Sequence, residues 1–113
     1  MNVCNEMRKL RKWLDRHDIE WVDVSDDYGI DIRDIDTWIC RTHFEVGGVH
    51  VSVINGHGSY GGFLIDEDKN QGYLEMMSDL CCREKWENPR GYLKANEIIK
   101  VIKKYMPKKE SSD

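Results

Sequence analysis

Four polar residues with the chemistry to hold an anion share one face of a predicted β-hairpin. Two runs of alternating apolar and polar side chains are separated only by Gly47-Gly48. Such a two-glycine turn joins antiparallel strands and fixes their register, so that Glu45 faces His50 and His43 faces Ser52. The polar candidates on this face are Arg41, His43, His50 and Ser52.

An anion or a nucleotide could bind to these groups, which are a guanidinium, two imidazoles and a hydroxyl on a rigid sheet. A solvated outer sheet face with cross-strand pairs such as Glu45–His50 would explain the same residues. A metal between His43 and His50 is not expected, because the register places them diagonally across the strands. Ser52 opposite His43 resembles a nucleophile and a base, but the sequence has no nucleophile elbow, so we expect no enzyme.

A glycine-rich loop follows the second strand of the hairpin, over residues 55–62. Its backbone N–H groups can form a nest for an anion, although a tight connection between strands would also use these glycines. The pattern from Gly56 to Gly61 matches a dinucleotide fingerprint in spacing, but the extended segment after it is not the helix that a Rossmann fold needs. The loop adds these ligand-binding candidates: Asn55, His57, Ser59 and Tyr60.

Residues 18–36 carry eight acidic side chains and one basic one, a net charge of −7. Such a run can meet a basic protein partner or can be a solvated loop. The whole chain has a net charge of −4, which argues against direct binding of nucleic acid. The candidate protein-binding residues are Asp23, Asp26, Asp27, Asp31, Asp34 and Asp36.

The four cysteines, Cys4, Cys40, Cys81 and Cys82, form no C-x-x-C pair, so the sequence predicts neither a metal site nor a cofactor. We expect ordinary reduced thiols, as in a cytoplasmic protein. No apolar run reaches the length of a membrane span, and the first residues do not have the pattern of a signal peptide.

The elements that position these residues follow from hydrophobic spacing. A first helix over residues 5–17 has an apolar stripe that ends at His17, with Arg11 among its solvated basic residues. Residues 19–24 form a short strand, and the hairpin supplies two more. A short helix over residues 72–83 and a connector at 87–91 follow. The last helix begins near Lys94 and ends before Pro107.

This order predicts an α+β fold. The expected architecture is a three-stranded antiparallel sheet, or a four-stranded one if residues 63–65 are a strand, with the N- and C-terminal helices packed on one face. The length of 113 residues fits a single domain, which we place at 1–107, followed by a frayed tail at 108–113. If the polar sheet face formed a homodimer, its site residues would be interface residues.

Several short segments resemble small uncharacterised proteins encoded by bacteriophages and mobile elements of gut Firmicutes. The segments that carry this resemblance are Arg41-Thr42-His43-Phe44, Ser52 to Gly56, Ser59 to Gly62, Gly72 to Met76, and Leu93 with Glu97-Ile98-Ile99. The element order is similar to that of some anti-CRISPR proteins. It is also similar to the double-stranded-RNA-binding domain, but only Lys94 stands where that family has a run of lysines.

This resemblance implies a non-enzymatic protein of the host bacterial cytoplasm that inhibits a host defence component, such as a nuclease complex. The acidic segment would block the nucleic-acid site of its target. The alternative is sequestration of a small nucleotide signalling molecule by the Arg/His/glycine-loop site. A structural or protein-interaction domain is a further alternative.

Overall fold

The computed structural model describes residues 4–24, 39–56 and 73–107, and these residues form one layer of β-sheet and one layer of helices. The elements in chain order are α1 (Asn5–Arg16), β1 (Trp21–Asp23), β2 (Ile39–Val46), β3 (Val49–Gly56), β4 (Leu74–Ser78), α2 (Asp79–Arg83), β5 (Arg90–Leu93) and α3 (Ala95–Tyr105). The predicted tail at 108–113 and the possible strand at 63–65 lie outside the described residues.

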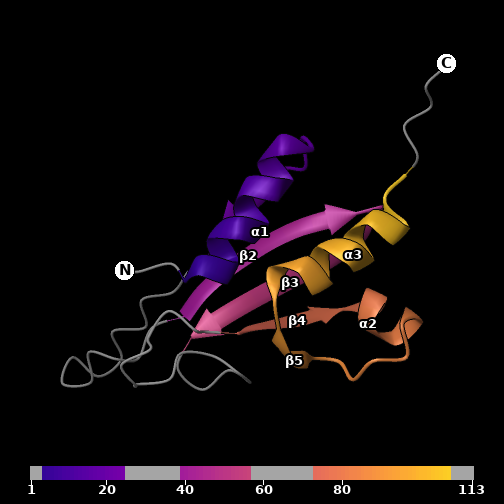
Figure 1. Cartoon of the computed structure of the whole chain (residues 1–113). Helices are drawn as coiled ribbons and strands as arrows, with labels where there is room; N and C mark the ends of the chain where they lie inside the picture. The colour runs from indigo at the N-terminus through magenta and orange to yellow at the C-terminus, as the bar shows by residue number, and fades with distance from the viewer. Residues whose placement is uncertain (1–3, 25–38, 57–72, 108–113) are drawn as a thin grey trace, which may run out of the picture.

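The five strands form one antiparallel sheet in the order β1-β2-β3-β4-β5, so each strand pairs with its neighbour in sequence. Helices α1 and α3 lie side by side across one face of this sheet (Figure 1). The predicted α+β fold with both terminal helices on one face is therefore confirmed. The sheet has more strands than the predicted three or four, because β4 and β5 extend it.

The β2–β3 hairpin has the predicted register. Val46 pairs with Val49, and His43 pairs with Ser52. Both turn glycines have positive φ, +56° at Gly47 and +82° at Gly48, as a two-residue hairpin turn of this hand requires. The hairpin thus turns its valines toward the helices and its histidines toward the other face.

The prediction of a helix over residues 72–83 is wrong for its first part. Residues 74–78 form strand β4, and the helix is only the five residues of α2. Leu, Glu and Met favour helices when isolated, but pairing with β3 overrides that preference. In the predicted helix Met77 would lie on the apolar side, whereas in β4 its side chain is exposed. The predicted connector at 87–91 likewise runs into β5.

The two terminal helices are close to their predicted bounds. Met7, Leu10 and Leu14 of α1 are fully buried, as are Ile98 and Ile102 of α3. Helix α3 begins with a capping interaction in which the Lys94 backbone N–H donates to Glu97 Oε1 at 2.8 Å. These residues and the inner side chains of the strands form one core.

One residue of α1 and the residue that caps its C-terminus differ from their predicted places. Arg11 was predicted to be solvated, but it is buried, with 9% of its surface exposed, because its guanidinium reaches partners on β2. His17 was predicted to extend the apolar stripe. It is exposed and stacks on Trp13 with 4.1 Å between ring centroids. All four cysteines are free, and Cys82 alone is exposed.

Candidate functional site

The face of the sheet opposite α1 and α3 carries the polar side chains of the hairpin. Because side chains alternate along a strand, the buried residues Thr42 and Phe44 face the helices, and His43 between them faces the other way. Strand pairing then sets rows across the sheet. One row runs from His43 through Ser52 to Met77. A second row runs from Arg41 through Ile54 to Glu75.

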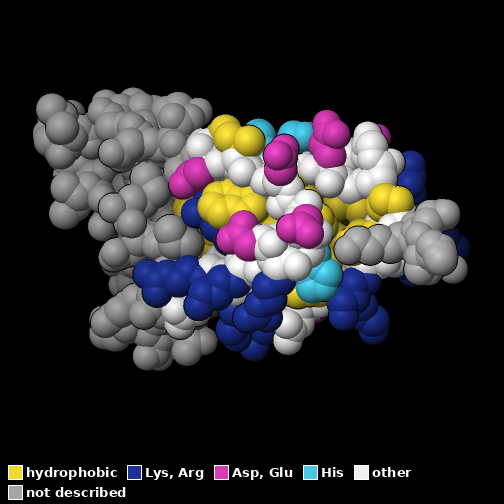
Figure 2. Space-filling view, turned by 90° about the horizontal axis from the view of Figure 1, so that it is seen from above, with side chains coloured by type: hydrophobic (Ala, Val, Ile, Leu, Met, Phe, Trp, Pro, Cys, Tyr) yellow, Lys and Arg dark blue, Asp and Glu magenta, His cyan; other side chains and the backbone are white. Residues whose placement is uncertain are grey.

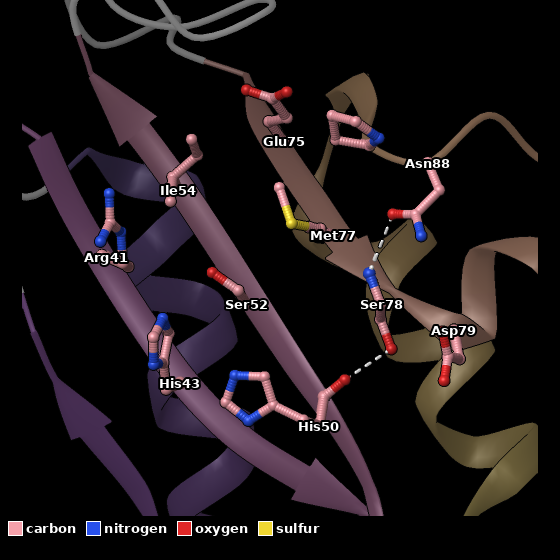
Figure 3. Close-up of a pocket in the computed structure, with 11 residues that line it drawn as sticks. Arg41, His43, His50, Ser52, Ile54, Glu75, Met77, Ser78, Asp79 and Asn88 are labelled. Carbon is pink, nitrogen blue, oxygen red and sulfur yellow. Dashed lines mark hydrogen bonds between the residues drawn. The ribbon is translucent and has the colours of Figure 1, made fainter.

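These rows form the floor and sides of a groove of about 590 Å³ on this open face (Figure 3). That volume is in the range of sites that bind small molecules. The groove is lined by Arg41, His43, His50, Ser52, Ile54, Glu75, Met77, Ser78, Asp79, Asn88 and Pro89.

Ser78 fixes the wall of the groove at the point where β4 becomes α2. Its hydroxyl donates to the carbonyl oxygen of His50 at 2.7 Å and accepts from the backbone N–H of Leu80 at 3.2 Å. Its own backbone N–H donates to Oδ1 of Asn88 at 3.1 Å. Ser78 therefore joins the strand that carries His50 to the segment that carries Asn88 and Pro89, which keeps the groove in one shape.

The imidazoles of His43 and His50 meet edge to face at one end of the groove. Their ring centroids are 4.8 Å apart and their planes are 84° apart. Burial lowers the pKa of His43, and the nearby charges of His50 and Arg41 lower it further. His43 is therefore neutral at pH 7. An anion placed against the two rings would reverse this preference by stabilising the protonated form.

The groove has a polarised arrangement of side chains (Figure 3). Arg41, His43 and His50 lie on β2 and β3, whereas the carboxyl groups of Glu75 and Asp79 lie on β4 and α2. The aliphatic side chains of Ile54 and Met77 lie on the floor between the two sides, and 54% of Met77 is exposed. This arrangement suits a ligand that has an anionic end and a body with apolar surface and hydrogen-bond donors.

The structure brings together four of the predicted ligand-binding residues, namely Arg41, His43, His50 and Ser52. It separates Asn55 from them. Asn55 is fully buried on the helix-facing side of β3, where its Nδ2 donates to the carbonyl oxygen of Tyr73 at 2.9 Å. His57, Ser59 and Tyr60, with the rest of the predicted glycine loop, lie outside the described residues.

Of the acidic candidates, Asp23 at the end of β1 lies within the described residues. Its Oδ2 is 3.5 Å from Nη1 of Arg11, and half of its side chain is exposed. The other acidic candidates, Asp26, Asp27, Asp31, Asp34 and Asp36, lie outside the described residues.

Seven lining residues were not predicted as site residues from the sequence. Ile54 and Met77 lie on the floor of the groove, and the other five make up the far wall, namely Glu75, Ser78, Asp79, Asn88 and Pro89. The alternation of Leu74, Glu75 and Met76 was a signal for a strand, but it is too short to outweigh the helical preference of these residue types. Asn88 and Pro89 reach the groove only through the turn of the chain after α2, which no local pattern specifies.

Within residues 4–24, 39–56 and 73–107, no three or more His, Cys, Asp or Glu side chains are placed to hold a metal ion. In the same part of the chain, no helix has both the length and the apolar composition to cross a bilayer. Comparison of the chain with protein-family models, curated proteins and solved structures finds no match.

Proposed function

We propose that this protein binds a small phosphate-bearing ligand, such as a nucleotide, in the groove on the open sheet face. The observation that carries the proposal is the convergence of His43, His50 and Ser52 in a groove of about 590 Å³. Two imidazoles and a hydroxyl supply donors for phosphate oxygens. Arg41 adds positive charge to the same side, and the Ile54–Met77 floor offers apolar contact to a base.

The proposed role is binding without turnover. Ser52 pairs with His43 across β2 and β3, but it lies inside a paired strand and not on the sharp strand-to-helix turn that exposes a serine nucleophile in a nucleophile elbow. The setting that we propose is sequestration of a nucleotide signal in the bacterial cytoplasm by a protein of phage or mobile-element type. We expect a bound nucleotide to be recovered chemically unchanged, and release of phosphate would contradict this role.

A matched pair of variants tests the groove. Met77 and Tyr92 are exposed hydrophobic residues, 54% and 66% exposed, but only Met77 lines the groove. Met77→Glu places a carboxylate beside the proposed phosphate and should weaken nucleotide binding by about tenfold or more. Tyr92→Glu makes the same change of net charge outside the groove and should leave the affinity unchanged. Calorimetry with adenosine and guanosine mono- and diphosphates measures both.

Two results would overturn the proposal. If none of these nucleotides binds the intact protein at millimolar concentration, or if both variants weaken binding equally, the groove is not a nucleotide site. Circular dichroism of each variant establishes that the sheet is intact.

A second candidate function is inhibition of a defence protein through the acidic segment. The observation that favours it is an acidic edge beside β1. Asp18 and Glu20 line a hollow of about 770 Å³ together with exposed Val22 and with Glu45. Figure 2 shows acidic side chains around hydrophobic ones on this side of the molecule. A basic protein surface that normally holds nucleic acid would complement both features.

Reversal of charge tests this second function. The triple change of Asp26, Asp27 and Asp31 to lysine should abolish binding to a defence nuclease complex. Raising the salt concentration should weaken binding of the unchanged protein. As a control, Glu87→Lys makes the same reversal of charge at an exposed residue after α2, away from the acidic edge. Unchanged binding by the triple variant would exclude the acidic segment as the contact.

A further inference from the structure

We propose that the groove recognises a terminal phosphate, that is, a phosphomonoester dianion, in preference to a phosphodiester, by holding it against His43 and His50. This inference rests on the proposed function and specifies which class of nucleotide the site selects. The selectivity comes from two properties of the phosphate group. These are the number of its negative charges that the histidine pair can compensate and the number of its free oxygen atoms that can accept hydrogen bonds.

The two imidazoles are in contact in the empty groove. With 4.8 Å between ring centroids, protonation of one ring disfavours protonation of the other in the empty groove. The lowered pKa of His43, caused by burial and then by His50 and Arg41, agrees with this. A bound group with two negative charges compensates both rings. A group with one negative charge leaves a second imidazolium without compensation.

The two classes of phosphate also differ in the number of free oxygen atoms that can accept hydrogen bonds. A terminal phosphate presents three free oxygen atoms, whereas a diester presents two. The groove end holds an imidazole from β2, an imidazole from β3 and the Ser52 hydroxyl, and Figure 3 shows all three on the same side of the sheet. Three donors therefore match the three oxygen atoms of a monoester.

The charges around the histidine pair also bear on the ligand. The charged and titratable groups that face the pair are Arg41 and Glu45 from β2, Glu75 from β4 and Asp79 from α2. His17, Asp18 and Glu20 line the adjoining hollow. The five carboxyl groups outweigh the positive charge of Arg41, so attraction of a dianion depends on protonation of the two histidines.

This dependence predicts an optimum pH. An imidazole ordinarily titrates near pH 6.5, and the second ionisation of a phosphomonoester has a pKa of about 6. At higher pH an imidazolium that pairs with the phosphate loses its proton, and at lower pH the phosphate loses its second charge. Binding of a monoester should therefore be tightest between about pH 6 and 6.5 and about tenfold weaker at pH 8. Binding of a diester should vary less with pH.

Calorimetry on the full chain tests the inference with two probes that share a base and a sugar. These are adenosine 5′-monophosphate and its 3′,5′-cyclic diester. At pH 6.5 the monoester should bind at least about tenfold more tightly. His43→Gln and His50→Gln should remove both this preference and the pH optimum. His17→Gln removes an exposed histidine that lines the adjoining hollow but not the groove, and it should change neither.

A measurement on the unmutated protein gives a second test that does not depend on whether the histidine variants fold. Proton NMR follows the titration of each histidine with inorganic phosphate or with dimethyl phosphate. Phosphate should raise the midpoints of His43 and His50 but not that of His17, and dimethyl phosphate should move them less. Equal affinity for monoester and diester with no pH optimum would overturn the inference and leave the proposed function standing. Absence of binding by either nucleotide and by the mono- and diphosphates above would overturn both.

Discussion

Arg11 on α1 donates from Nε to the hydroxyl oxygen of Thr42 on β2, at a distance of 2.8 Å. The same guanidinium lies 4.6 Å above the centroid of the Trp21 ring and 3.5 Å from the carboxylate of Asp23. One buried cation thus joins the first helix to two strands, and its partners Trp21 and Asp23 lie within the acidic segment. Its charge is compensated by a hydrogen bond, an aromatic face and a carboxylate.

Removal of this cation should destabilise the fold. Arg11→Ala leaves the hydroxyl of Thr42 without its donor and removes packing against Trp21. We expect the free energy of unfolding to fall by about 1–3 kcal/mol, measured by urea denaturation. Arg8→Ala removes an exposed arginine from the same helix and should change it by less than about 0.5 kcal/mol. Equal effects of the two substitutions would show that Arg11 acts only through net charge.

The link between α3 and the segment after α2 should respond to acid. The Tyr105 hydroxyl donates to Glu84 Oε2 at 2.6 Å. This hydrogen bond, followed by that from Lys104, lowers the pKa of Glu84. The folded state therefore gains stability above the ordinary glutamate pKa, and it loses this gain as the pH falls through the lowered value.

Tyr105→Phe should accordingly lower the midpoint of urea unfolding at pH 7, and the difference from the unchanged protein should shrink toward pH 3. Tyr92→Phe is the control, because Tyr92 is a tyrosine with 66% of its surface exposed. A deficit of the same size at both pH values would show that the hydroxyl contributes through packing and not through the carboxylate.

His43 should make the empty protein less stable in mild acid. Because its folded pKa is lowered, the unfolded chain takes up a proton first as the pH falls. Stability is therefore lost from about pH 6.5 down to the folded pKa. His43→Gln should reduce the fall in melting temperature between pH 7 and pH 5, and His17→Gln should not. An unchanged pH profile in His43→Gln would contradict the assignment.

The hairpin turn offers a comparison between two adjacent glycines. A Cβ at Gly47 would lie 2.9 Å from the carbonyl oxygen of Tyr105, whereas a Cβ at Gly48 would meet open space. Both positions have positive φ and share that conformational cost. Gly47→Ala should thus cost about 1–3 kcal/mol of unfolding free energy and clearly more than Gly48→Ala. Equal costs would show that the end of α3 moves aside freely.

The sequence predicts those parts of the molecule that depend on residues close together in the chain. The hairpin register follows from alternation and two glycines, and it places His43 and Ser52 together as the structure has them. Strand β4 does not follow in this way, because residues such as Leu74 and Met76 become a strand only through pairing with β3. Burial of Arg11 depends on partners about 30 positions away, which helical spacing does not reveal. The half of the groove on β2 and β3 was therefore predictable, and the wall on β4 was not.

The contact between the terminal helices has a consequence for biosynthesis. Glu6 of α1 accepts a hydrogen bond from the backbone N–H of Ala95 at the start of α3, 2.7 Å away and 89 positions later in the chain. At a synthesis rate of roughly 5–20 residues per second, the second partner follows the first by roughly 5–20 s. During that interval the apolar side of α1 cannot complete its packing against α3, so it stays exposed on the nascent chain.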